Sequence, residues 1–230
     1  MSGTLLSGLV ALSVALPLAL GGAIHLTEFS SAGQRRRLRQ VIDIVAAVPP
    51  IVYAVFALLV VIPAMRFGGA WFGDPSPFNV LGAGAVVGLM LTPLLMALTA
   101  DALASVPKSR REAAYALGAR PFQAIVFVVI PAAAPTIVGG VLLTGSRAVG
   151  EMVILFLIGG HQPVFALDPT APAETLTGYL LGVADGQFAA DSIASQSMFA
   201  VGLVLFVVTF ISNLVGIRLR RAAWHTRAEV

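Results

Sequence analysis

Long runs of apolar residues with few charges inside them set the pattern of this chain. The runs cover residues 4–26, 41–63, 79–100, 132–158 and 198–217. An α-helix of about 20 mostly apolar residues is long enough to cross the hydrocarbon core of a bilayer. The pattern therefore predicts an all-α fold, a polytopic bundle of five transmembrane helices.

The composition supports a membrane location. Hydrophobic residues make up 58% of the 230 residues and charged residues only 11%, whereas roughly 25% charged residues are typical of a soluble domain. We expect a single transmembrane domain over residues 1–230. The chain has no cysteine, which excludes disulfides and thiol catalysis. His25, His161 and His225 are scattered without metal-ligand spacing, so no metal site is expected.

The basic residues predict the orientation in the membrane. Most of the 14 fall in three clusters, which follow the first, third and fifth apolar runs. Because basic loops stay in the cytoplasm, the amino terminus is expected outside and the carboxyl terminus inside. Loops 64–78 and 159–197 would be external. The clusters are Arg35, Arg36, Arg37 and Arg39; Lys108, Arg110, Arg111 and Arg120; and Arg218, Arg220, Arg221 and Arg227.

Two charges, Arg147 and Glu151, lie inside the fourth apolar run. Residues four apart share one face of a helix, so the two side chains are expected to meet near mid-bilayer. A charge there costs about 3 kcal/mol, which places both residues towards the bundle interior or a wet cavity. Three interpretations stay open: a structural ion pair, an anion path in which Glu151 holds Arg147 in place, and a gate without substrate contact.

The remaining polar features have simpler interpretations. Pro49 and Pro50 in the second run and Pro93 in the third predict kinks. Glu28, Asp43 and Asp101 lie near the cytoplasmic ends of their spans and are interpreted as interfacial charges with basic neighbours. The acidic loop 159–197 could dock an external binding protein, or form a solvated cap.

The cytoplasmic segment 105–131 is unusual for a loop. Pro107 and Pro121 are placed as helix starters and Gly118 as a helix stop, which predicts two short helices at an angle. The first helix is basic on one side and offers a small apolar side that needs a partner. An amphipathic helix on anionic lipid is the alternative. The apolar side consists of Ala113, Ala114, Tyr115 and Leu117.

The same segment carries a family resemblance. Glu112, Ala113 and Ala114, then Gly118, and later the run ending at Pro131 resemble the "EAA" loop of the membrane subunits of ABC importers. The resemblance implies the type I ABC importer permease fold. It also implies that these residues form a coupling helix, which sits in a groove of a cytoplasmic ATPase.

The resemblance extends over nearly the whole chain. The stretches beginning "GTLLSGLVAL" and "RRRLRQVIDIV" look like the first two core helices of Pst-type phosphate permeases. "RAVGE" at 147–151 is similar to their Arg and Glu motif, which is implicated in phosphate passage. Met152 stands where Thr is common. Members usually carry a further amino-terminal helix, so either the start is late or this is a minimal five-span version.

The resemblance implies a permease subunit for phosphate, or for molybdate, tungstate or sulfate, in the plasma (inner) membrane. Its partners would be an ABC ATPase dimer, a second homologous permease, an external substrate-binding protein and lipid, with no nucleic acid. ATP and Mg would belong to the ATPase, since the chain has no Walker A motif and is not expected to be an enzyme. The rival is a self-powered channel or secondary transporter.

Overall fold

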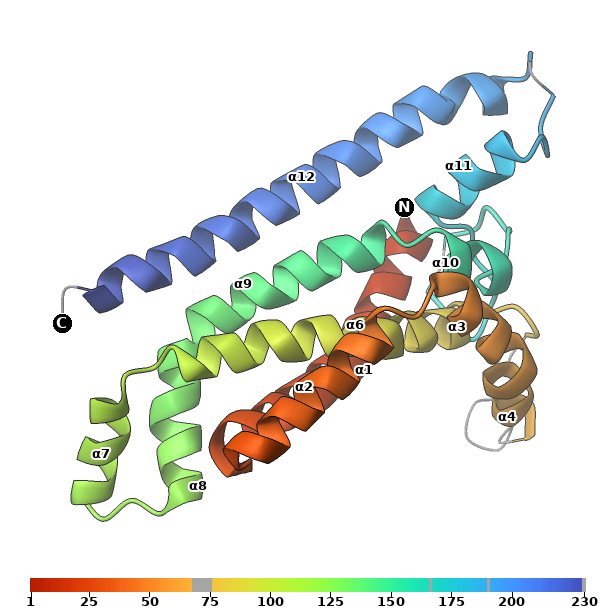
Figure 1. The fold of residues 1–230 in the computed structure, drawn as a ribbon. Helices are drawn as coiled ribbons and strands as arrows, with labels where there is room; N and C mark the ends of the chain where they lie inside the picture. The colour runs from red at the N-terminus through yellow and green to blue at the C-terminus, as the bar shows by residue number, and fades with distance from the viewer. Residues whose placement is uncertain (68–75, 166, 190, 229–230) are drawn as a thin grey trace.

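The computed structural model describes residues 1–67, 76–165, 167–189 and 191–228 (Figure 1). Within these ranges the chain forms helices and loops and contains no strand. Five helices are long and apolar enough to cross a membrane. The all-α fold class and the number of spans are therefore confirmed. Residues 68–75 of the expected external loop 64–78 lie outside the described residues.

Among the described residues, three of the five candidate spans consist of shorter helical pieces that follow one another, and the other two lie within single helices. They comprise α1 (Ser2–Ile24) with the π-helical turn η1 (His25–Phe29); α3 (Pro50–Phe56) with η2 (Ala57–Val61) and α4 (Ile62–Phe67); α6 (Val80–Ala104); α8 (Pro121–Ala124) with η3 (Ile125–Val129) and α9 (Ile130–Val149); and α12 (Ile193–Ala228). The elements outside the spans are α2 (Ala32–Ala46), α7 (Lys108–Ala116), α10 (Val153–Ile158) and α11 (Leu176–Ala184).

Helices α1 and α6 form the centre of the molecule and approach closely through small residues. The buried side of α1 repeats a small residue at about every fourth position, as in Ala11, Ala15 and Ala19. On α6, a Cβ atom added to Gly88 would lie 2.5 Å from the carbonyl oxygen of Ala11. Small residues allow such backbone contact, which is how helices gain packing energy inside a bilayer.

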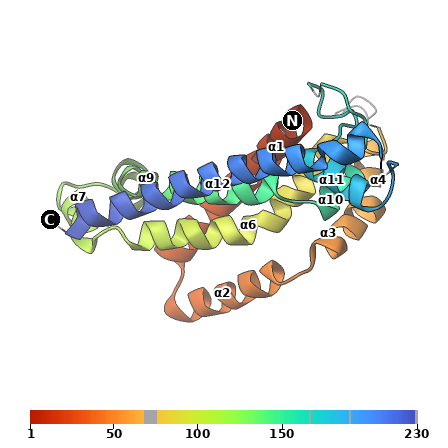
Figure 2. The ribbon, with the colours of Figure 1, turned by 90° about the horizontal axis from the view of Figure 1, so that it is seen from above.

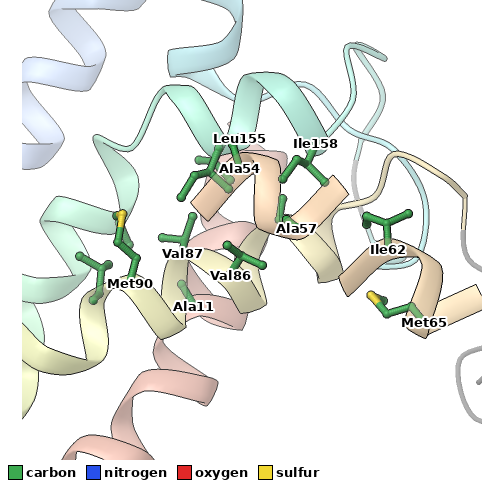
Figure 3. Close-up of a cluster of buried hydrophobic side chains, with 14 residues drawn as sticks. Ala11, Ala54, Ala57, Ile62, Met65, Val86, Val87, Met90, Leu155 and Ile158 are labelled. Carbon is green, nitrogen blue, oxygen red and sulfur yellow. The ribbon is translucent and has the colours of Figure 1, made fainter. Parts of the chain in front are cut away.

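A second layer covers this pair. Helix α12 packs antiparallel on α9, and α9 packs on both α1 and α6 (Figure 1). In the amino-terminal half of α6, the buried cluster drawn in Figure 3 joins Ala11, Val86 and Val87 to Leu155 and Ile158 of α10. The outer side of α12 leaves large apolar side chains exposed, including Phe199, Phe206 and Phe210.

The second apolar run does not form the single helix that was expected. Helix α2 ends at Ala46, and a new helix begins with Pro50 at its first turn, so residues 47–49 form a break. A proline suits the first turn because its missing N–H would be unpaired there in any case. Pro49 and Pro50 therefore start a helix instead of kinking one. Helix α2 lies to one side of the bundle with no buried residue (Figure 2).

The segment after α10 packs on the helix ends instead of standing free. The N–H of Leu81 donates to the carbonyl of Pro169 at 2.7 Å, and the N–H of Leu176 donates to the hydroxyl of Thr4 at 2.8 Å. Helix α11 follows, with the Thr175 hydroxyl accepting a bond from the N–H of Gly178 at its first turn. Part of the loop 159–197 is thus helical.

Candidate functional site

The fourth apolar run is divided between Arg147 and Glu151. Helix α9 ends at Val149, and α10 begins at Val153. The expected continuous helix over 132–158 is therefore not formed, and the membrane-length helix extends over Pro121–Val149 instead. Within the described residues, Arg147 and Glu151 form no ion pair. The two charges lie at the ends of two different helices.

Each charge suits the helix end at which it lies. Arg147 is in the last turn of α9, where the helix dipole favours a positive charge. One carboxylate oxygen of Glu151 accepts hydrogen bonds from the N–H groups of Val153 at 3.0 Å and Ile154 at 3.2 Å. Met152 occupies the N-cap position and has no side-chain acceptor, so Glu151 caps α10 in its place.

Arg147 lines a cavity of about 230 Å³ between α6, the end of α9 and the laterally placed α2, here called the central cavity because it is level with the middle of α6. The cavity is level with Pro93, in the middle of α6, and is bounded on the other side by the break between α2 and α3. Asp43 is the acidic residue on its wall. Glu151 does not line it. The described lining residues are Ile42, Asp43, Ala46, Val48, Pro50, Met90, Leu91, Pro93, Leu94, Ala97 and Arg147.

The guanidinium of Arg147 has no protein partner in the part of the chain that the structure describes. It forms no hydrogen bond and no ion pair there, and the residue is exposed in the single chain. A guanidinium presents five N–H donors in a fixed fork that matches the oxygens of carboxylates and phosphates. The cavity thus holds an unused anion-binding group.

Segment 105–131 contains the expected first helix and the expected stop. Helix α7 ends at Ala116, and Gly118 has φ of +84°. The N–H of Gly118 donates to the carbonyl of Tyr115 at 2.9 Å, and that of Ala119 to the carbonyl of Ala114 at 3.0 Å. This is a Schellman ending, which favours glycine at the left-handed position. Pro121, by contrast, begins the fourth membrane helix and not a second separate short helix.

The apolar side of α7 is largely uncovered. Ala114 is buried, whereas Glu112 and Ala113 are exposed. Leu117 is 90% exposed and Phe122, just beyond it, is 70% exposed. The expectation that α7 buries its apolar side is therefore met within this chain only at Ala114. The remaining surface is available to another molecule.

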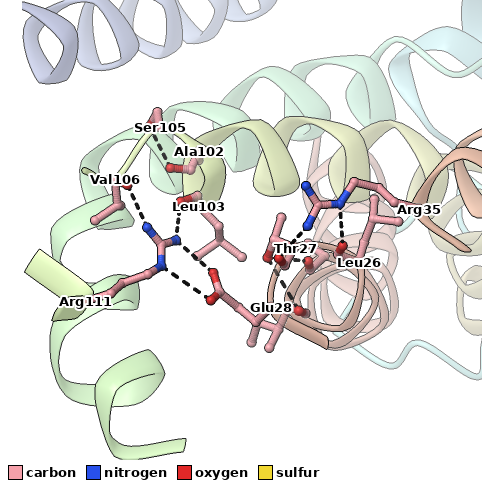
Figure 4. Close-up of polar contacts among 11 residues, drawn as sticks. Leu26, Thr27, Glu28, Arg35, Ala102, Leu103, Ser105, Val106 and Arg111 are labelled. Atoms are coloured by element: carbon pink, nitrogen blue, oxygen red, sulfur yellow. Dashed lines mark hydrogen bonds and ion pairs between the residues drawn. The ribbon is translucent and has the colours of Figure 1, made fainter. Parts of the chain in front are cut away.

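Arg111 fastens α7 to the membrane helices, a role that the sequence did not reveal (Figure 4). Its guanidinium forms an ion pair with Glu28 of η1 at 2.8 Å, and both side chains are largely buried. The same group donates to the carbonyls of Val106 at 2.6 Å and Leu103 at 3.0 Å. These carbonyls are at and just beyond the carboxyl end of α6. One side chain therefore joins α7, α6 and η1.

A second arginine closes the end of the first membrane helix in a similar way (Figure 4). Arg35 of α2 donates to the carbonyls of Leu26 at 3.0 Å and Thr27 at 2.7 Å. Farther along α2, Arg39 reaches Asp101 of α6 at 3.3 Å in an exposed pair. The basic neighbours expected for Glu28 and Asp101 are thus present, whereas Asp43 instead lines the central cavity.

One hydrogen bond joins α9 to α12 beside Arg147. The Ser146 hydroxyl donates to the side-chain oxygen of Asn213 at 2.6 Å. Asn213 was not predicted as a partner, although an amide inside an apolar run is a signal for such a contact. The bond holds α9 to α12 one residue before Arg147.

The acidic segment between α10 and α12 has a defined local structure in its described residues. The hydroxyl of Thr170 donates to the Asp168 carboxylate at 2.7 Å and its N–H donates at 2.8 Å, which holds the pKa of Asp168 below its usual value. Partial burial raises the pKa of Glu174. Among the described residues, no group of three or more His, Asp or Glu side chains gathers as a metal site would require.

Residues 15–223 match the family described as binding-protein-dependent transport system inner membrane component. The chain belongs to this family. It is 35% identical over 209 residues to a probable ABC transporter permease protein, YqgH, of Bacillus subtilis, covering 90% of this chain and 65% of that protein. It is 30% identical over 226 residues to the phosphate transport system permease protein PstC of Pasteurella multocida, covering 90% and 69%.

This permease chain spans about two thirds of the length of those relatives. Among solved structures, the MetNI methionine ABC transporter in an inward-facing conformation matches with a TM-score of 0.63 at 20% identity. The match covers 96% of this chain and 91% of the other. A bacterial ABC transporter that imports alginate matches with a TM-score of 0.64 at 18% identity, covering 94% and 77%. The chain therefore has the same fold as these two structures.

Proposed function

We propose that this chain is one permease subunit of an ATP-driven importer and that it lines the path for phosphate or a similar oxyanion across the plasma membrane. The observation that carries the proposal is the free guanidinium of Arg147 in the central cavity. An unpaired charge at that depth in a membrane is costly, and ionisable residues that carry this cost usually have a functional role. The phosphate permease among the relatives supports phosphate as the anion.

The proposal requires partners. The exposed apolar sides of α12 and α3 fit a second, related permease that would close the other half of the path. The exposed segment around Glu112, Ala113, Ala114 and Gly118 fits a cytoplasmic ATPase dimer, which would hold ATP and Mg. An external binding protein would deliver the anion to the side of α11. The amino terminus would then face outside and the carboxyl terminus the cytoplasm.

The mechanism follows from the way the elements are joined. ATP-driven closure of the ATPase dimer would move α7, and the contacts of Arg111 would transmit that movement to η1 and to the end of α6. Both elements continue into the two helices at the centre of the bundle. Alternating access at Arg147 would result from their tilting.

Uptake of radiolabelled phosphate by vesicles that carry the whole assembly tests the substrate. We expect uptake that requires ATP inside the vesicle and the binding protein outside. Unlabelled phosphate should compete with the label more strongly than sulfate or molybdate does. Competition by sulfate or molybdate that exceeds competition by phosphate would assign the path to that anion instead.

Co-purification of the ATPase tests the coupling segment. Glu112→Arg and Leu117→Asp change exposed residues, so the permease should still fold but retain little ATPase. Arg36→Gln, on an exposed side of α2, is the matched control and should retain all of it. An ATPase complex that survives both changes in α7 would contradict docking at this segment.

A further inference from the structure

Asp43 and Arg147 are the charged residues on the wall of the central cavity, whose other described lining residues are apolar. The two residues come from α2 and α9, which are far apart in the sequence. The cavity of about 230 Å³ is several times the volume of roughly 30 Å³ that one water occupies in the liquid. A small hydrated anion would therefore find room between an acid and a base.

The register of α2 explains why Asp43 faces the cavity. Arg39 lies one turn earlier on the same face of α2, and its guanidinium reaches Asp101 of α6 at 3.3 Å. Residues four apart share a face of a helix. Arg39 and Asp43 therefore point from α2 to the same side, towards α6 and the cavity that Arg147 lines.

Neither charge is neutralised by the other. Within the described residues, Asp43 and Arg147 form no ion pair, and no hydrogen bond engages either side chain. Glu151 cannot supply the acidic partner from its present position, because its carboxylate caps α10. An anion on Arg147 would thus have the Asp43 carboxylate as its charged neighbour in the cavity.

We propose that Asp43 competes with the transported anion for Arg147 and so sets how readily the anion leaves. The inference rests on the proposed function, since it presumes that an anion passes Arg147. While the anion is bound to Arg147, the negative charge of Asp43 repels it and weakens its binding. After the anion leaves, approach of α2 to α9 lets Asp43 pair with Arg147 and prevents the anion from returning.

The test measures two quantities in the whole assembly reconstituted in vesicles: the rate of phosphate uptake at saturating phosphate, and the labelled phosphate retained by the purified complex. Asp43→Asn should lower the rate by roughly fivefold to tenfold and increase retention. Asp43→Glu keeps the charge and should restore most of the rate. Asp101→Asn, which removes the exposed pair with Arg39 but leaves the cavity wall intact, is the matched control.

A double variant separates this role from simple positioning of α2. If Asp43 acts on the anion held by Arg147, then Asp43→Asn combined with Arg147→Gln should behave like Arg147→Gln alone. The inference would be overturned if the effects of the two substitutions on the uptake rate multiplied, or if Asp43→Asn had the same uptake rate and retention as Asp101→Asn. The proposed function would stand in either case. Uptake at the native rate by Arg147→Gln would overturn the proposed function, and the inference with it.

Discussion

Two arginines in two regions of this molecule have opposite surroundings. At the junction of α7, α6 and η1, Arg111 is largely buried and donates to Glu28 and to two carbonyls at the end of α6. In the central cavity, Arg147 has no partner among the described residues. A guanidinium whose donors are mostly used holds helices together, whereas one whose donors are unused can bind an anion that arrives and leaves.

The comparison also shows that the number of charged residues does not reveal which of them stabilise the fold and which take part in transport. Both residues contribute equally to the positive charge of the chain, and both lie within about one turn of a helix end. Removal of Arg111 leaves the largely buried carboxylate of Glu28 without its ion pair, which is a stability effect. Removal of Arg147 leaves nothing unpaired, so its effect should appear in transport. The two kinds of effect can be measured separately.

Arg111→Gln should give the largest loss of stability. The change leaves Glu28 without its ion pair in a largely buried place, at a cost of roughly 3 kcal/mol. We expect a clearly lower Tm for the purified permease in detergent. Arg110→Gln, one residue earlier and exposed, is the control and should melt as the native chain does. A native Tm for Arg111→Gln would show that the junction is held by other contacts.

Gly118→Ala should have an intermediate effect at the same end of the molecule. Gly118 has φ of +84° and open space around it, so the added methyl group meets no neighbour. The cost is conformational alone, about 1 kcal/mol. Gly118→Asn should cost less, because asparagine tolerates this backbone region better. The Tm should decrease from the native chain to Gly118→Asn and then to Gly118→Ala. The opposite order would contradict the prediction.

Ser146→Ala should have a small effect on the side of Arg147. It removes the hydrogen bond to Asn213 between α9 and α12, and such bonds within membranes average about 0.6 kcal/mol. Ser212→Ala, which removes only a bond within α12, is the matched control. Urea or thermal unfolding of both variants tests the difference. An equal loss in the two would show that the bond between the helices contributes nothing.

Arg39→Gln should have the smallest effect on stability. Its ion pair with Asp101 is more than half exposed on both sides, and exposed pairs contribute below about 1 kcal/mol and weaken in salt. The Tm of the variant should approach the native value as salt increases from low to physiological concentration. A difference in Tm that salt does not change would show that Arg39 contributes through packing.

The sequence predicted the number of spans and the ending of α7, because both depend on local features. Apolar runs are read from hydropathy alone, and a glycine after a helical run is a strong stop. The EAA-like residues lie, as predicted, on a short helix between the third and fourth membrane helices, with Glu112 and Ala113 exposed and Ala114 buried. Their cytoplasmic location stays a prediction. Their role in ATPase binding stays a prediction, as does the role of Arg147 in anion passage.

The helix breaks could not be predicted in the same way. Residues 47–49 carry no charge and residues 150–152 carry one, Glu151, so the apolar runs continue across both breaks. The second break depends on a few backbone hydrogen bonds to Glu151, and a spacing of four residues indicated a shared helix face instead. Contacts between distant segments, such as Arg111 with Glu28 or Asp43 on the cavity of Arg147, leave no local pattern.

The measurement that tests the central claim most directly is labelled phosphate uptake per assembled complex, with Arg147→Gln compared to the native chain. The account predicts that the variant assembles with its ATPase, melts at the native Tm and takes up little or no phosphate. Native uptake per complex by Arg147→Gln, with assembly intact, would contradict the claim that this arginine meets the anion.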